Sequence, residues 1–171
     1  MIITLPVPYE DLKKKLSGSG SIGIIFCNSG ARISGYGGLE GARRLAEKLE
    51  RDGYRVAYAT ICGSPCNLKL LKQVAGNPVW RSIDTIVVSG CDSFYINAER
   101  VFRGKKIVKA YTDTYGNALV SLRSNEILIT NPNPKAMEKL GLSIESEDAI
   151  PFNKLLDAYK KKYNMEVYPP W

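Results

Sequence analysis

The first two thirds of the chain alternate between short apolar runs and amphipathic stretches. Continuous apolar runs predict buried strands at four places, 21–26, 54–61, 84–90 and 105–113. Apolar residues at helical spacing predict helices before, between and after these strands, within 8–18, 39–53, 67–76 and 93–104. Strands that alternate with helices form βαβ units. The pattern therefore predicts a three-layer α/β fold around a mainly parallel four-stranded sheet that is covered on both faces.

The pattern changes after residue 117. Segment 118–130 predicts a hairpin that turns at Ser124 and Asn125, Asn133 predicts the cap of a short helix, and 148–164 predicts a last helix. We therefore expect an α/β domain over residues 1–120 that carries the functional site. Residues 121–171 are expected to form an extension, a C-terminal hairpin and helices, packed on the same domain. The sheet is expected to be flavodoxin-like in style.

Three of the four cysteines stand at the ends of apolar runs. Cys27 ends SIGIIFC, Cys62 ends YRVAYATIC and Cys91 ends IDTIVVSGC. Because parallel strands all run the same way, these ends share the carboxyl edge of the sheet, where neighbouring strands lie about 4.8 Å apart. Cys66 follows Cys62 by four residues and is able to fold back to the same place. We expect the four thiols to meet in one pocket.

The residue types restrict the chemistry of such a pocket. The chain has no histidine, which excludes a Ser-His-Asp or Cys-His arrangement and a mixed Cys/His zinc site. Converging thiolates favour zinc or an iron–sulfur cluster, with Cys27, Cys62, Cys66 and Cys91 as the candidate metal ligands. Two alternatives stay open. Cys27 or Cys91 is a thiol nucleophile whose pKa is lowered by a helix N-terminus, or the cysteines are small buried hydrophobic residues.

A glycine-rich loop and several polar residues lie near the expected edge. Gly35, Gly37 and Gly38 precede a helix without the spacing of a dinucleotide-binding loop. They either let the backbone approach a bound group closely or form a simple turn. Asp113 ends the fourth predicted strand. It is either a contact to a cofactor or a residue that starts a turn. Four tyrosines either line a pocket for a planar ligand such as a flavin or are half-buried aromatics, namely Tyr36, Tyr95, Tyr111 and Tyr115.

Charge and hydropathy argue against nucleic acid and membranes as partners. The net charge is +7, but the basic residues are scattered apart from two short lysine runs on predicted helices, so nucleic acid is not an expected partner. No apolar run is long enough to cross a membrane, and the first residues lack the arrangement of a secretory signal. We therefore expect a cytoplasmic protein, in which cysteines remain free thiols or metal ligands.

The order of motifs resembles a known family. The strand that ends in Cys27, the Gly-Gly pair before a helix, and the segments CNLKLL, DTIVVSGCDSFYINAERVFRGKKIV and AYTDTYGN resemble the C-terminal or MetV-type domain associated with methylenetetrahydrofolate reductases. Cys27, Cys66 and Cys91 match cysteines of that pattern, and Cys62 lies outside it. A weaker similarity is to DGC-type zinc-binding domains, whose third cysteine follows a glycine as in SGC here. The first resemblance implies a cysteine-bound zinc or iron–sulfur site and a flavin-containing catalytic reductase subunit as partner.

These observations lead to one expected function and two alternatives. We expect a cysteine-ligated metal protein that serves as an accessory or electron-transfer module, beside a folate-linked methylene reductase or as a homo-oligomer. The first alternative is a stand-alone thiol redox protein or enzyme that uses Cys27 or Cys91. The second is a binding module for a flavin or nucleotide in which the cysteines are incidental. The chain has no complete set of catalytic residues, so no reaction is assigned.

Overall fold

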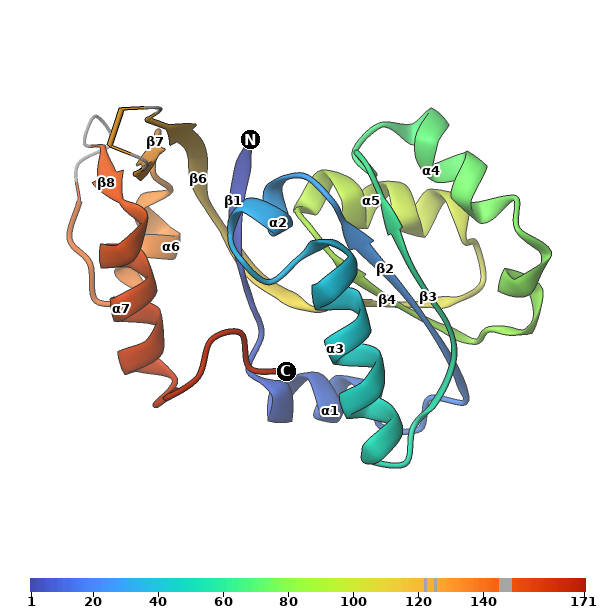
Figure 1. The fold of residues 1–171 in the computed structure, drawn as a ribbon. Helices are drawn as coiled ribbons and strands as arrows, with labels where there is room; N and C mark the ends of the chain where they lie inside the picture. The colour runs from blue at the N-terminus through green and yellow to red at the C-terminus, as the bar shows by residue number, and fades with distance from the viewer. Residues whose placement is uncertain (122, 125, 145–148) are drawn as a thin grey trace.

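Two four-stranded sheets lie side by side in the computed structural model, which describes residues 1–121, 123–124, 126–144 and 149–171 (Figure 1). The first sheet is parallel, with the strand order β3 (Arg55–Cys62), β2 (Ser21–Cys27), β4 (Thr85–Ser89), β5 (Lys106–Lys109). The second is antiparallel, with the order β1 (Ile2–Pro6), β6 (Tyr111–Val120), β7 (Ile127–Thr130), β8 (Ile150–Pro151). The predicted α/β class and the parallel four-stranded sheet are confirmed.

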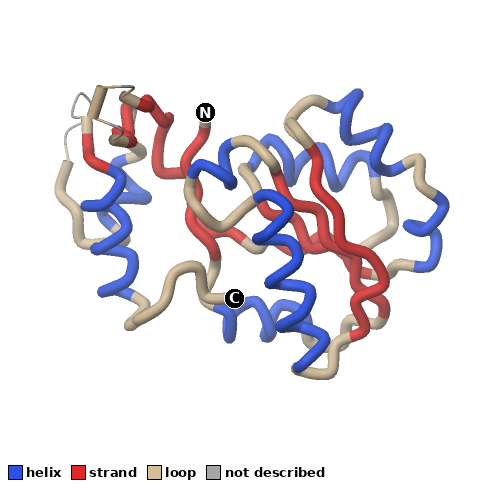
Figure 2. The backbone as a smooth tube through the Cα atoms, in the orientation of Figure 1, coloured by secondary structure: helices blue, strands red, loops and turns tan. Residues whose placement is uncertain are grey.

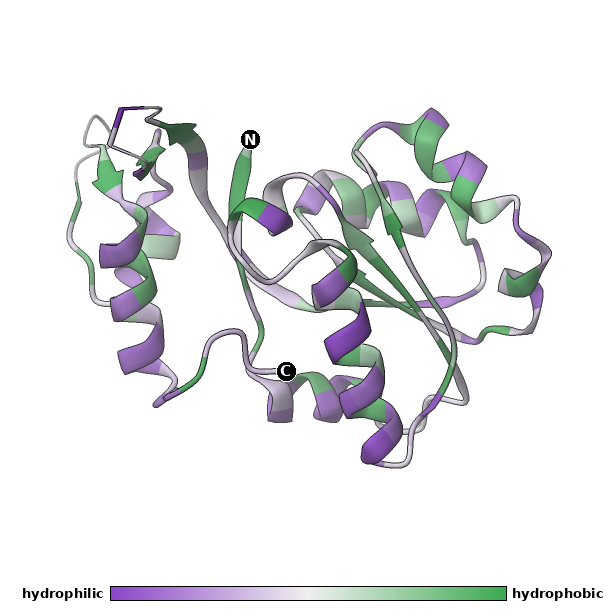
Figure 3. Cartoon of the chain, viewed as in Figure 1, coloured by the Kyte–Doolittle hydropathy of each residue, from purple (hydrophilic) through white to green (hydrophobic). Residues whose placement is uncertain are grey.

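Helices cover both faces of the parallel sheet, and Figure 2 shows its strands between them. One face packs against α1 (Tyr9–Leu16) and α3 (Gly38–Arg51), and the other against α4 (Leu68–Ala75) and α5 (Asp92–Val101). Every residue of β2 and β4 is buried, as expected for central strands covered on both sides. The edge strand β3 has alternating exposed residues instead. The outward sides of α3 and of α7 (Phe152–Lys162) are largely hydrophilic (Figure 3).

The order of the parallel strands sets the position of the sheet's crevice. From the central strand β2 the chain passes to β3 on one side and then crosses to β4 on the other. The carboxyl ends of β2 and β4 are therefore the point at which the strand order reverses. Ligands of open α/β sheets bind outside the strand ends at such a point.

The second sheet combines the two ends of the chain. The strand β1, which the hydrophobic pattern did not predict, pairs with β6, so that Ile2 lies opposite Asn117. The predicted hairpin is present, because β6 pairs with β7 from Val120 opposite Ile127, although Asn125 of its expected turn lies outside the described residues. One face carries α7 and α6 (Pro134–Glu138), and Asn133 caps α6 as predicted by accepting a hydrogen bond from the Ala136 N–H.

One predicted strand was wrong in its extent. The run 105–113 is not a single strand, since β5 ends at Lys109 and β6 begins at Tyr111 in the other sheet. Ala110 joins the two sheets, because its N–H donates to Val88 and its carbonyl accepts from the N–H of Val7. The remaining short helices are α2 (Gly30–Ile33) and the 3₁₀ turn η1 (Pro78–Ser82). Among the described residues, no helix has the length and apolar character needed to cross a membrane.

Close packing between α3 and the loop before it gives a test of the fold. A β-carbon on Gly41 would lie 1.9 Å from the Tyr36 carbonyl oxygen. We predict that Gly41→Ala lowers the free energy of unfolding by about 1–3 kcal/mol in urea titrations, although alanine favours helices by about 1 kcal/mol over glycine. Glu47→Ala, on the exposed side of the same helix, is the control and should change stability by less than about 0.5 kcal/mol. A stabilised Gly41→Ala protein would contradict this packing.

Candidate functional site: four cysteines at the carboxyl edge

Three neighbouring strand ends bring three cysteines to one edge. Cys27 and Cys62 are the last residues of β2 and β3 and lie opposite each other in the parallel register. Cys91 follows β4 as the N-cap of α5. The exit from β4 passes beside Cys27, because a β-carbon on Gly90 would lie 3.2 Å from the Cys27 β-carbon. The direction of the strands therefore places Cys27, Cys62 and Cys91 at the same edge of the sheet.

Cys66 reaches the same edge on the loop between β3 and α4. Its side chain is exposed, whereas Cys27 and Cys62 are buried and Cys91 is intermediate. The Cys66 carbonyl accepts a hydrogen bond of 2.9 Å from the Asn97 amide on α5. After it, Asn67 caps α4 by accepting from the Lys69 N–H at 3.0 Å. The loop is thus tied to both α4 and α5.

Burial and neighbouring thiols both raise the pKa values of two of the four cysteines. Burial raises the pKa of Cys62 and of Cys91 above the ordinary thiol value. Charge on Cys27 and on Cys66 raises both values further, while neighbouring backbone N–H groups act in the opposite direction. Burial is the largest cause for both cysteines, and the neighbouring thiols contribute less. We call these residues, Cys27, Cys62, Cys66 and Cys91, the four-cysteine site.

The donor set of the four-cysteine site fits zinc or an iron–sulfur cluster in its chemistry. Thiolates are the ligands of closed zinc sites and of such clusters, and all four cysteines are free. Their arrangement in this structure does not by itself form a metal site. No group of three or more Cys, Asp or Glu residues in the described part of the chain, which includes all four cysteines, is close enough to hold a metal ion. Ligation therefore requires the side chains to turn toward one another.

A buried polar chain connects the glycine loop to the end of β4. The Thr4 hydroxyl donates to the Gly90 carbonyl at 2.6 Å, and its oxygen lies 2.6 Å from the Tyr36 hydroxyl. Tyr36 is fully buried, and burial raises its pKa. Among the predicted loop residues, Gly38 has φ +70° and Gly37 leaves no room for a β-carbon beside Ala31. Backbone conformation thus explains Gly38, and packing explains Gly37. An approach of this loop to a bound group stays a prediction.

Two other predicted residues, Asp113 and Gly35, contact residues of the C-terminal part of the chain. Asp113 lies within β6, and its carboxylate pairs with Lys139 at 2.8 Å. Gly35, with φ +79°, packs near Tyr168 of the C-terminal segment. Cys91 lies near Tyr111, and its charge contributes to raising the pKa of that tyrosine, mainly raised by burial. The structure therefore brings Tyr111 rather than Asp113 into the neighbourhood of a cysteine.

Sequence reasoning missed an ion pair directly beside Cys91. The Asp92 carboxylate accepts from Lys109 at 2.6 Å and from the Tyr111 hydroxyl at 3.0 Å. The Lys109 ammonium also lies 4.4 Å from the centre of the Tyr95 ring. Lys109 lowers the pKa of Asp92 although burial acts in the opposite direction. An acidic residue at the first position of a helix was the available signal. The pair lies at the first turn of α5, next to Cys91.

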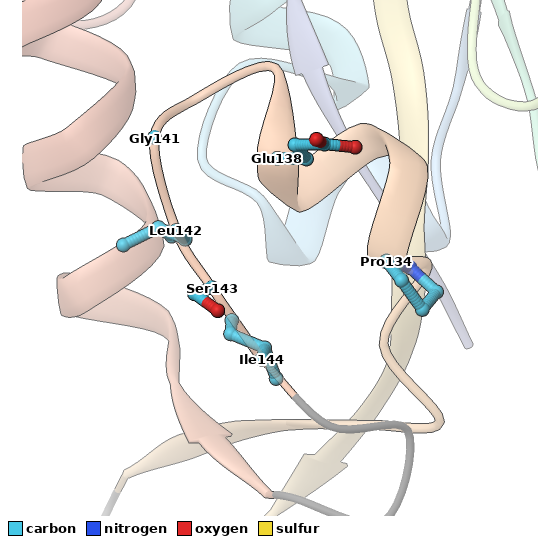
Figure 4. A pocket seen from close by; sticks show the side chains of 6 residues that line it. All are labelled: Pro134, Glu138, Gly141, Leu142, Ser143 and Ile144. Atoms are coloured by element: carbon cyan, nitrogen blue, oxygen red, sulfur yellow. The ribbon is translucent and has the colours of Figure 1, made fainter.

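A cavity of about 440 Å³ lies between α6 and the segment after it (Figure 4). Among the residues that the structure describes, its lining contains one carboxylate and no cysteine, and consists of Pro134, Glu138, Gly141, Leu142, Ser143 and Ile144. The cavity therefore belongs to the second sheet and adds no ligand to the four-cysteine site. Comparison with family models, with curated proteins and with solved structures finds no match to this chain.

Exposure and pKa predict the order in which the thiols of the metal-free protein react. At neutral pH, maleimide should modify Cys66 at least about tenfold faster than Cys62, because Cys66 is exposed and Cys62 is buried with a raised pKa. As the pH increases, the modification rate of an ordinary thiol levels off once the thiol is ionised. The modification rate of Cys91 should continue to rise above that pH, because its raised pKa shifts its ionisation to higher pH. Peptide mapping by mass spectrometry measures each rate. Faster modification of Cys62 than of Cys66 would contradict the geometry.

Proposed function

We propose that the four-cysteine site holds zinc or an iron–sulfur cluster and that the chain is a metal-bearing accessory or electron-transfer module. The observation that supports the proposal is the position of four cysteine residues, on three neighbouring strand ends and the loop after one of them, along a single edge of the sheet. Zinc would cross-link these segments, and a cluster would in addition accept and release an electron. The residues of this chain supply the thiolates and hold their backbones in place.

The strand order supports this location. In sequence order the parallel strands run 2-1-3-4, as in a flavodoxin-like sheet, and the crevice of such folds lies at the reversal beside the first and third strands. Cys27 and Cys91 follow those two strands. Free thiols in such numbers are kept reduced in the cytoplasm, which we propose as the compartment.

The pKa direction at Cys91 argues against nucleophilic chemistry there and is compatible with metal ligation. A reactive cysteine requires a lowered pKa, whereas burial raises that of Cys91 despite the N–H groups of Phe94 and Ser93 at the start of α5. A thiol that is protonated in the metal-free protein is still a good ligand, because a soft metal ion displaces the proton. A flavin-containing reductase subunit, implied by the resemblance, is the partner to test first.

Anaerobic isolation followed by elemental analysis tests the proposal. We predict zinc, or iron with acid-labile sulfide, bound to the protein, and thiols that react with a thiol reagent only after a chelator removes the metal. Cys27→Ser and Cys62→Ser should each weaken metal binding at least about tenfold. Ser89→Ala, which alters a buried side chain at the end of β4 without removing a thiol, is the matched control and should keep its metal.

Two other results would assign the protein differently. Metal-free protein whose thiols form a reversible disulfide would support the thiol redox alternative. A bound yellow chromophore with freely reactive thiols would support the flavin-binding alternative. Either result, in protein kept anaerobic throughout, contradicts a metal site.

A further inference from the structure

A buried amide on α5 holds the loop that carries Cys66. Asn97 is 9% exposed, and its Nδ2 donates to the Cys66 carbonyl at 2.9 Å and lies 3.4 Å from the Pro65 carbonyl. A buried amide without partners would be costly, so this side chain is committed to the loop. Asn97 is also six residues after Cys91 on the helix that Cys91 caps. One side chain thus joins the segments that bear two of the four thiols.

The two neighbours of Cys66 are held on the side of α4 and the core, because Pro65 is buried and Asn67 caps α4, while Cys66 itself is exposed. Cys66 and Gly63 are exposed, and a β-carbon on Gly63 would meet nothing within 4 Å. Within the loop, the Asn67 N–H donates to the Ser64 carbonyl at 2.8 Å, which shapes the turn but does not attach it to the sheet. The attachment to α5 therefore comes from Asn97. Outer groups of this kind hold metal ligands in position, and their loss weakens metal binding about 10- to 100-fold.

We propose that Asn97 is a positioning residue that fixes Cys66 opposite Cys91, so that the four-cysteine site can close around a metal. The inference rests on the proposed function. A purely structural role is the alternative, in which Asn97 satisfies two carbonyl groups and supports stability alone. The two roles differ in one respect. A positioning residue acts on the metal only through Cys66, so its effect disappears when Cys66 is already removed.

Cobalt titration of the full chain, freed of metal under anaerobic conditions, separates the two roles. Co²⁺ reports its ligands through the intensity of the thiolate-to-cobalt charge-transfer band. We expect Asn97→Ala to weaken Co²⁺ binding about 10- to 100-fold and to lower the band per bound ion as Cys66→Ser does. The double variant should bind within about threefold of Cys66→Ser alone, because coupled residues are not additive. Asn97→Asp, which places an oxygen against two carbonyls, should resemble Asn97→Ala.

Ala98→Gly is the control for stability. It weakens the same helix at a buried position and leaves the amide of Asn97 in place, so it should keep the charge-transfer band of the unaltered chain. A band in Asn97→Ala as strong as in the unaltered chain, while Cys66→Ser loses intensity, would overturn the role of Asn97 alone. Additive losses in the double variant would do the same. The absence of any thiolate band in the unaltered chain would overturn the proposed function itself.

Discussion

The shared direction of four strands is the constraint on which the rest of this structure depends. Because β2, β3 and β4 run the same way, their carboxyl ends lie along one edge, and a cysteine placed at or just after each end lies at that edge. Separate sequence segments thereby form one site without a long loop. The apolar character of β2 and β4, buried along their whole length, is what holds that direction in place.

The second sheet contributes to the same edge. Strand β1 is an edge strand of the second sheet, and Thr4 on it links Tyr36, in the segment after Cys27, to the Gly90 carbonyl just before Cys91. The C-terminal segment adds a further contact, since Trp171 packs edge-on against Phe26 and Tyr36. The backbones that carry Cys27 and Cys91 are therefore fixed by buried contacts, whereas the loop of Cys66 is held by the buried Pro65, by the Asn67 cap of α4 and by the Asn97 amide.

The local hydrophobic pattern was sufficient to predict the parallel sheet and most helices. It was not sufficient to predict strands whose partners lie far away in the sequence. The runs of β2 and β4 are apolar and bounded by glycine or polar residues, so their strand character was readable. Strand β1 was missed because its partner is β6, more than a hundred residues later, as the pairing of Ile2 with Asn117 shows. The predicted strand 105–113 crossed from one sheet to the other because Ala110, where the sheets meet, carries no breaker signal.

The candidate site was likewise predictable in its position but not in its detailed contacts. Strand ends predicted the edge on which the cysteines lie, but side-chain rotamers and the support given by Asn97 depend on packing between helices. The most direct test of the account is X-ray absorption at the metal edge of anaerobically isolated protein. The account predicts a first shell made only of sulfur, at about 2.3 Å if the metal is zinc. A first shell of oxygen or nitrogen, or protein without bound metal, would contradict it.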